Sequence, residues 1–197
     1  MKHLALWACF LMVAGGCNEV RTDRPMPPEG KELSRFPRAL RGTWGLTFDP
    51  SFLDDSATFD MAREGAKMFV QIAKDEIAFL EDSLGGTPED RGTLDSDTLA
   101  LKAFRDGWIL STKDSHGWSP MYFSLHENSI GIGLNDLSES KADSICQLLN
   151  QELVMDSIGV LGLDAFMYHF QIESNEAFYS SLANEIAPYF IMEKLKQ

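Results

Sequence analysis

Apolar and polar residues alternate along the middle of the chain, which is the pattern of half-buried β-strands. The alternation is clearest in Leu99, Leu101 and Ala103 and again in Ile130, Ile132 and Leu134. Tight turns are predicted at Lys74-Asp75, at Arg105-Asp106-Gly107, where Asp-Gly is typical of a hairpin, and at Glu127-Asn128. The pattern predicts seven strands joined as an antiparallel meander with one apolar face, at residues 41–48, 67–73, 76–81, 98–104, 108–112, 121–126 and 129–134.

Helical spacing replaces this alternation in the last third of the chain. Apolar residues recur from Ala142 to Leu153, after the candidate caps Asp136 and Ser138. A last helix is predicted after Ser174 or Asn175, with an apolar face at Phe178, Leu182, Ile186 and Phe190 and with Pro188 kinking it or ending its first half. Residues 158–172 form a further strand region, and residues 50–66 form a loop or a short helix.

These elements together predict a β-rich α+β domain. The sheet would be an antiparallel meander barrel or a strongly curved sheet, packed by one or two C-terminal helices.

The first seventeen residues form a separate segment with its own pattern. Lys2 supplies a positive start, residues 4–13 are mostly apolar, and Ala14, Gly15 and Gly16 precede Cys17. The apolar run is too short to cross a bilayer of about 30 Å as a helix, so the layout is typical of a secretory signal peptide.

The small residues followed by Cys17 resemble the lipobox of bacterial lipoproteins. The resemblance implies cleavage after Gly16, with lipid on the Cys17 thiol and on the new amino end, although Ala14 stands where the family usually has leucine. Asn18 follows the cysteine where some bacteria use aspartate as an inner-membrane retention signal, which favours the outer membrane of the cell envelope. The alternative is an ordinary signal peptide that ends near a cysteine.

The domain organisation follows from these segments. We expect residues 1–16 to be a signal peptide, residues 17–34 a lipid-anchored flexible tether rich in proline, and residues 35–197 a single globular domain. After cleavage and lipidation only Cys146 remains as a free thiol, so no intramolecular disulfide can form, and its helical apolar surroundings predict a small buried residue.

The charge of the chain is uneven and restricts its partners. Residues 42–197 carry 10 Lys and Arg against 26 Asp and Glu, whereas residues 18–41 carry six against four. Phosphate contacts need clustered basic residues, so a body this acidic argues against binding of nucleic acid and against contact with anionic headgroups.

Gly42-Thr43-Trp44, at the head of the first predicted strand, resembles the Gly-x-Trp signature of lipocalins. The resemblance implies a tryptophan that plugs the closed end of a barrel whose open end holds an apolar ligand. Lipocalins usually stack a late arginine over this tryptophan, and this chain has no arginine after Arg105. The candidate ligand-binding residues are Trp44, Trp108, Trp118 and Tyr122, and the same side chains could instead form a packed core.

Other motifs give little support for catalysis or for a cofactor. The histidines at 116, 126 and 169 lack metal-ligand spacing, and only tertiary structure could bring them together. Asp114-Ser115-His116 contains the residue types of a triad, but neighbours in one loop cannot align as nucleophile, base and orienting acid. The acidic pairs lack the spacing of an EF-hand, and no phosphate-binding loop is present.

The sequence therefore predicts a non-enzymatic envelope lipoprotein that uses no metal or cofactor. It would be tethered to the membrane through Cys17 and would bind a small apolar ligand or a protein partner. The alternative is an envelope enzyme whose site is assembled from scattered polar residues. An open apolar mouth would favour the first function, and a cleft with convergent carboxylates or histidines would favour the second.

Overall fold

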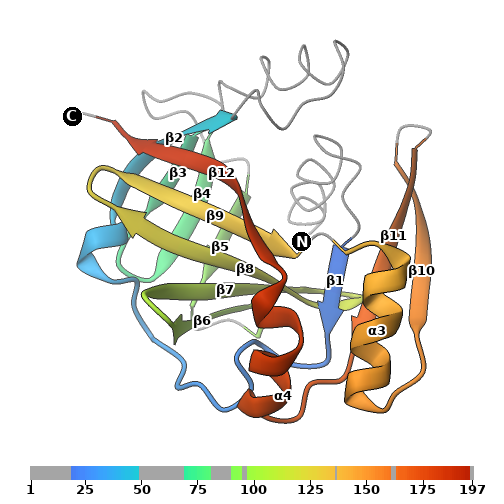
Figure 1. The fold of residues 1–197 in the computed structure, drawn as a ribbon. Coiled ribbons are helices and arrows are strands. Elements are labelled where there is room, and N and C mark those ends of the chain that lie inside the picture. Colours follow the sequence, from blue (N-terminus) through green and yellow to red (C-terminus); the bar gives the residue numbers. More distant parts are fainter. Residues whose placement is uncertain are drawn as a thin grey trace.

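The computed structural model describes residues 19–48, 69–80, 90–94, 97–135, 137–160 and 163–195 (Figure 1). Three predicted features lie outside the described residues: the loop or short helix at 50–66, the expected signal peptide at 1–16, and the expected lipidation site Cys17. The elements are β1 Glu19–Thr22, η1 Arg38–Leu40, β2 Gly42–Phe48, β3 Phe69–Ile72, β4 Glu76–Leu80, β5 Asp90–Thr93, β6 Leu99–Phe104, β7 Gly107–Asp114, β8 Gly117–His126, β9 Ser129–Asn135, α3 Glu139–Leu149, β10 Val154–Val160, β11 Leu163–Phe170, α4 Asn175–Ser180, η3 Leu182–Asn184 and β12 Ile186–Lys194.

The β-rich α+β class is confirmed, with the sheet strongly curved and not closed. Twelve strands of the described residues form one mixed sheet in the order β10-β11-β1-β8-β9-β12-β2-β3-β4-β5, and β7 and β6 continue from β8. No pairing joins β5 to β6 among the described residues, so the curved part stays open there. One pair is parallel, because β1 runs alongside β11 with Glu19 opposite Met167.

The three predicted hairpin turns are confirmed. They join β3 to β4 at residues 73–75, β6 to β7 at Arg105-Asp106, and β8 to β9 at Glu127-Asn128. Gly107 serves close packing, since a Cβ there would lie 2.1 Å from the Phe123 carbonyl oxygen on β8. The first helix is also confirmed: α3 follows Ser138 as N-cap and ends at Asn150, whose φ of 54° terminates it.

The predicted long C-terminal helix is wrong beyond Ser180. Residues 186–194 form β12, which lies between β9 and β2 and interrupts the expected meander. The helical spacing of Ile186 with its neighbours was fortuitous, because tertiary pairing with two strands stabilises the extended form of this β-branched and aromatic segment. Pro188, which lacks an N–H, sits where the register with β9 shifts.

Two hydrophobic cores lie on opposite faces of β6, β7 and β8. Successive side chains of a strand point to opposite faces, so Leu110 joins one core and Ile109 the other. The first core fills the concave side of the curved sheet and contains Trp44, Leu101 and Phe123 among others. The second lies between these strands, β11, α3 and α4, and includes Cys146, which is buried as predicted.

The expectation of a flexible tether is wrong for residues 19–34. Glu19–Thr22 form β1 inside the sheet, and Val20 and Met26 are buried in the second core. Further along, the Leu33 amide donates to the Leu101 carbonyl at 2.8 Å, which covers the free edge of β6. A polar segment can pack here, because strand pairing satisfies its backbone groups and buried ion pairs satisfy its charged side chains.

The buried Lys102 side chain fastens this segment to the body. Its Nζ donates to the carbonyls of Pro25, Pro27 and Pro28 at 3.1, 3.0 and 3.3 Å. Burial lowers the pKa of the Lys102 ammonium, and nearby Glu32 opposes that shift.

Candidate functional site

Trp44, the tryptophan of the Gly-x-Trp motif, is a core residue. Its side chain is 1% exposed in the first core, and its Nε1 donates to the Leu40 carbonyl at 2.8 Å. The Lys194 ammonium lies 5.3 Å from the ring centroid, on the strand that pairs with β2. Lys194, near the C-terminal end of the chain, therefore stacks over Trp44 at the position where the lipocalin resemblance leads one to expect an arginine.

The other three predicted ligand residues do not gather with Trp44 around one cavity. Trp108 packs against the first core and Tyr122 against the second. Trp118 is nearly buried beside β1, with the Lys113 ammonium 5.5 Å from its ring centroid. The inward residues of β6, β7, β8 and β9, including Leu101 and Ile132, pack together in the first core.

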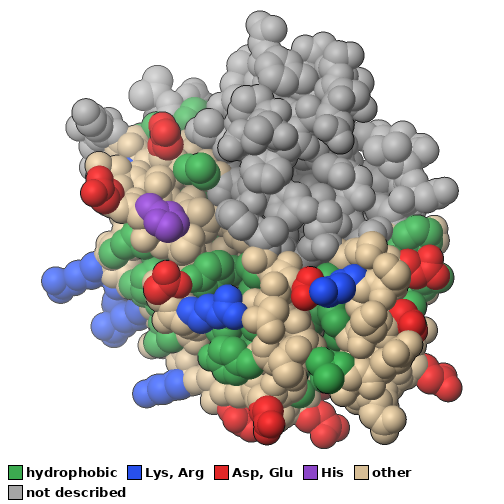
Figure 2. All heavy atoms as spheres, viewed as in Figure 1, with side chains coloured by type: hydrophobic (Ala, Val, Ile, Leu, Met, Phe, Trp, Pro, Cys, Tyr) green, Lys and Arg blue, Asp and Glu red, His purple; other side chains and the backbone are tan. Residues whose placement is uncertain are grey.

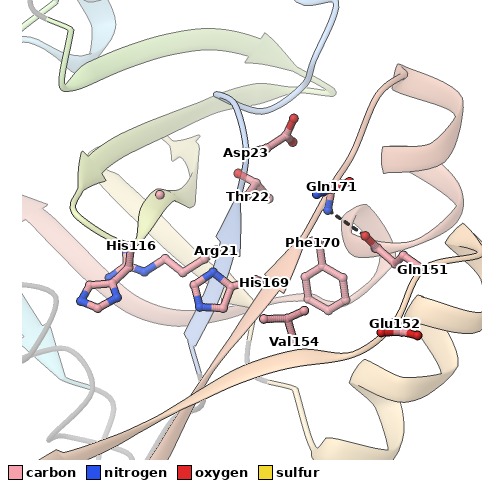
Figure 3. A pocket seen from close by; sticks show the side chains of 11 residues that line it. Arg21, Thr22, Asp23, His116, Gln151, Glu152, Val154, His169, Phe170 and Gln171 are labelled. Atoms are coloured by element: carbon pink, nitrogen blue, oxygen red, sulfur yellow. Dashed lines mark hydrogen bonds between the residues drawn. The ribbon is translucent and has the colours of Figure 1, made fainter.

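A pocket of about 540 Å³ lies instead where β1, β11 and the turn between β7 and β8 meet (Figure 3). None of the four predicted ligand residues lines it. Most of its lining residues are polar by type, but apolar atoms make up the larger part of the exposed lining, and Phe170 and Val154 are its apolar residues. The lining residues are Arg21, Thr22, Asp23, His116, Gly117, Gln151, Glu152, Val154, His169, Phe170 and Gln171.

Arg21 of β1 anchors one side of this pocket. Its side chain is 3% exposed, and its Nη2 lies 2.9 Å from both Glu19 Oε2 and Asp114 Oδ2. Ser119 donates to the other oxygen of Glu19 at 2.8 Å. Burial raises the pKa of the Glu19 carboxyl, and this outweighs the opposing effect of the Arg21 charge.

Two of the three histidines among the described residues converge on one carboxylate. Asp156 Oδ2 on β10 lies 3.0 Å from His169 Nε2 and 3.9 Å from His116 Nδ1. His126 lies elsewhere, 3.2 Å from the Ser124 hydroxyl. Among the described residues, no three histidine, cysteine or acidic side chains are arranged to hold a metal ion.

The Asp114-Ser115-His116 segment is a turn, as its residue types alone would suggest. The His116 backbone amide donates to Asp114 Oδ1 at 2.7 Å, so the aspartate shapes the β7–β8 hairpin.

Two buried donors of the pocket have no hydrogen-bond partner in the described structure. They are Arg21 Nε and the side-chain amide nitrogen of Gln151. The Gln151 oxygen is engaged, because it accepts from the Gln171 backbone amide at 3.0 Å. Figure 3 shows Arg21 beside the two histidine rings and Gln151 on the other side, near Phe170 and Gln171. Both nitrogens can only donate, so each lacks an acceptor oxygen.

Little in the amino-acid sequence pointed to this site. The polar run at residues 19–23 lacks strand periodicity, and its signal for a strand is limited to the β-branched Val20 and Thr22. His116, Gln151 and His169 come from three distant parts of the chain. Only the parallel pairing of β1 with β11 and the bridge of Thr22 to Trp118 bring them together.

Comparison of the chain with known protein families, curated proteins and solved structures finds no match. Within the described residues, no helix is both long and apolar enough to span a membrane.

Proposed function

We propose that this chain is an exported lipoprotein of the cell envelope that acts by binding rather than by catalysis, with the pocket beside β1 as its ligand site. The observation that carries the binding role is the pair of unpartnered buried donors in this pocket. An unsatisfied buried donor costs roughly 1–3 kcal/mol, and a ligand that supplies an acceptor removes this cost.

The groups of the pocket that could act as nucleophile or base are engaged in structural contacts. The Thr22 hydroxyl contacts the carbonyl oxygens of Arg24 and Trp118, at 2.9 and 3.2 Å. His169 contacts Asp156 rather than a hydroxyl group. These contacts favour binding, because a catalytic nucleophile needs a base within hydrogen-bond reach.

The anchor is supported by the lipobox-like residues before Cys17 and by the position of β1. Glu19 lies two residues after Cys17, and two extended residues span at most about 7 Å. A lipid on Cys17 would therefore hold the body directly at the bilayer surface. On the face in Figure 2, charged side chains of both signs lie among small apolar areas.

Membrane fractionation of cells that express the full chain tests the anchor. Cys17→Ser should abolish acylation and release the protein from membranes. Cys146→Ser is the matched control, because Cys146 is a buried free thiol and should leave acylation unchanged. A Cys17→Ser protein that is still acylated and membrane-bound would contradict the lipoprotein proposal.

A panel of small compounds tests the binding role. A compound that binds only the folded protein raises its melting temperature by mass action. We expect stabilisation by compounds rich in acceptor oxygens and none by fatty acids, since the inward strand faces are packed. Stabilisation by fatty acids alone would instead support the apolar-ligand version.

A second candidate function, an envelope enzyme, is favoured by one observation. Arg21 pairs with Glu19 and Asp114, and the rings of His116 and His169, both facing Asp156, lie beside it. The pKa of Glu19 is raised. Clusters of this kind also occur at catalytic sites. The two functions differ in outcome, because an enzyme would convert the compound that stabilises it, and His169→Gln would abolish conversion without abolishing binding.

A further inference from the structure

We infer that the pocket beside β1 binds a neutral saccharide, whose hydroxyl and amide oxygens accept hydrogen bonds from Arg21 Nε and Gln151 Nε2. The inference rests on the proposed binding function and names its ligand class. It begins from the fact that both unpartnered buried side-chain atoms found in the described residues belong to residues that line this one pocket.

The donors determine which atoms the ligand must present. Arg21 Nε and Gln151 Nε2 carry hydrogens and cannot accept, so each needs an oxygen acceptor. Arg21 is held in place by Glu19 and Asp114, and Gln151 by its bond from the Gln171 amide. Both nitrogens are buried, so a ligand oxygen reaches them only when a lining side chain moves, and we expect the exposed His116 ring to move aside for it.

The surrounding charges exclude an anion as the preferred ligand. The charge of Arg21 is already balanced by two carboxylates at 2.9 Å. Asp156 lies between the histidines, and the exposed Glu152 lines the other side. A phosphate or carboxylate would meet these negative charges without a free cation, whereas a neutral oxygen meets no repulsion.

A saccharide suits the remaining features of the lining. Its hydroxyl groups both accept and donate, so they can pair with the two donors and also donate to the Glu152 carboxylate. Its C–H faces can pack on Val154, which is 55% exposed, and against the edge of Phe170. The volume of about 540 Å³ lies in the usual range of small-ligand pockets and leaves room for more than one ring.

The test uses ¹⁵N-labelled protein with Cys17→Ser, which keeps every described residue. The side-chain NH₂ signal of Gln151 and the Nε–H signal of Arg21 report directly on the two donors. The disaccharide of N-acetylglucosamine should shift both signals saturably at millimolar concentration, and inorganic phosphate should not.

Gln151→Glu keeps the oxygen that accepts from the Gln171 amide and removes the donor. It should weaken saccharide binding by about tenfold or more, the effect of losing one good hydrogen bond, while the protein still unfolds in one cooperative transition. Gln147→Glu on the exposed face of α3 is the matched control and should bind like the parent protein.

The proposal is overturned if neither signal shifts with the disaccharide, or if phosphate shifts them and the disaccharide does not. Stabilisation by another neutral compound together with unshifted Gln151 and Arg21 signals would overturn the saccharide site while leaving the proposed binding function intact. Absence of stabilisation by every compound would contradict the binding function itself.

Discussion

Lys102→Met tests whether the N-terminal segment is an integral part of the fold. Methionine keeps most of the apolar stem of the side chain, which is 5% exposed, and removes the ammonium that donates to three proline carbonyls. Hydrogen bonds of a charged group contribute roughly 1.5–3 kcal/mol each, so three contribute about 4.5–9 kcal/mol. Removing a buried charge returns several kcal/mol of desolvation cost. The net expected loss in the free energy of unfolding is therefore about 2–4 kcal/mol.

Urea unfolding followed by tryptophan fluorescence measures this loss. Lys74→Met is the matched control, because Lys74 lies exposed in the β3–β4 turn and should change stability by less than about 0.5 kcal/mol. Cleavage by trypsin after Lys31, which is exposed next to this segment, should also become faster in Lys102→Met, since the segment that includes residues 25–28 loses its attachment. If Lys102→Met is as stable as Lys74→Met and is cleaved no faster, the segment is not fastened as the hydrogen bonds indicate.

Three further predictions concern single side chains. Trp44→Ala should cost about 3–5 kcal/mol in urea unfolding, the range for emptying a large aromatic site, and a loss below about 1 kcal/mol would contradict its core position. Burial raises the pKa of Glu19 above its ordinary 4.5, so its contribution to stability is complete below pH 4.5 and is lost as the pH rises through the folded pKa. The stability of the parent protein relative to Glu19→Gln should therefore fall as the pH rises from 4.5, and a difference that does not vary with pH would refute this. Burial and the hydrogen bond to Asp106 raise the pKa of Tyr122 to about 12, so tyrosine ring NMR should find it protonated at pH 11, and Asp106→Asn should lower its pKa.

The elements with a strong local signal were predictable from the sequence. The turn at Arg105-Asp106-Gly107 was predicted because Asp-Gly readily adopts hairpin geometry. The strands around Leu101 and Ile132 were predicted because one of their faces is apolar, and α3 because its apolar positions recur at helical spacing. These signals depend on residues close together in the chain.

Two segments were mispredicted because their structure depends on distant partners. Glu19–Thr22 form a strand because β11 pairs alongside it and because Asp114 satisfies Arg21. Residues 186–194 form a strand because β9 and β2 leave a place between them. In both segments the local conformational propensity is weak, and pairing with distant strands decides that the backbone is extended.

The sequence by itself determined the strand-rich class, the hairpins, the burial of Trp44 and Cys146, and the resemblance of residues 14–17 to a lipobox. Only the tertiary structure decided where a ligand site could lie. Arg21 and Gln151 are ordinary polar residues in the sequence, and they become unsatisfied donors only because folding removes them from water without giving each nitrogen an acceptor.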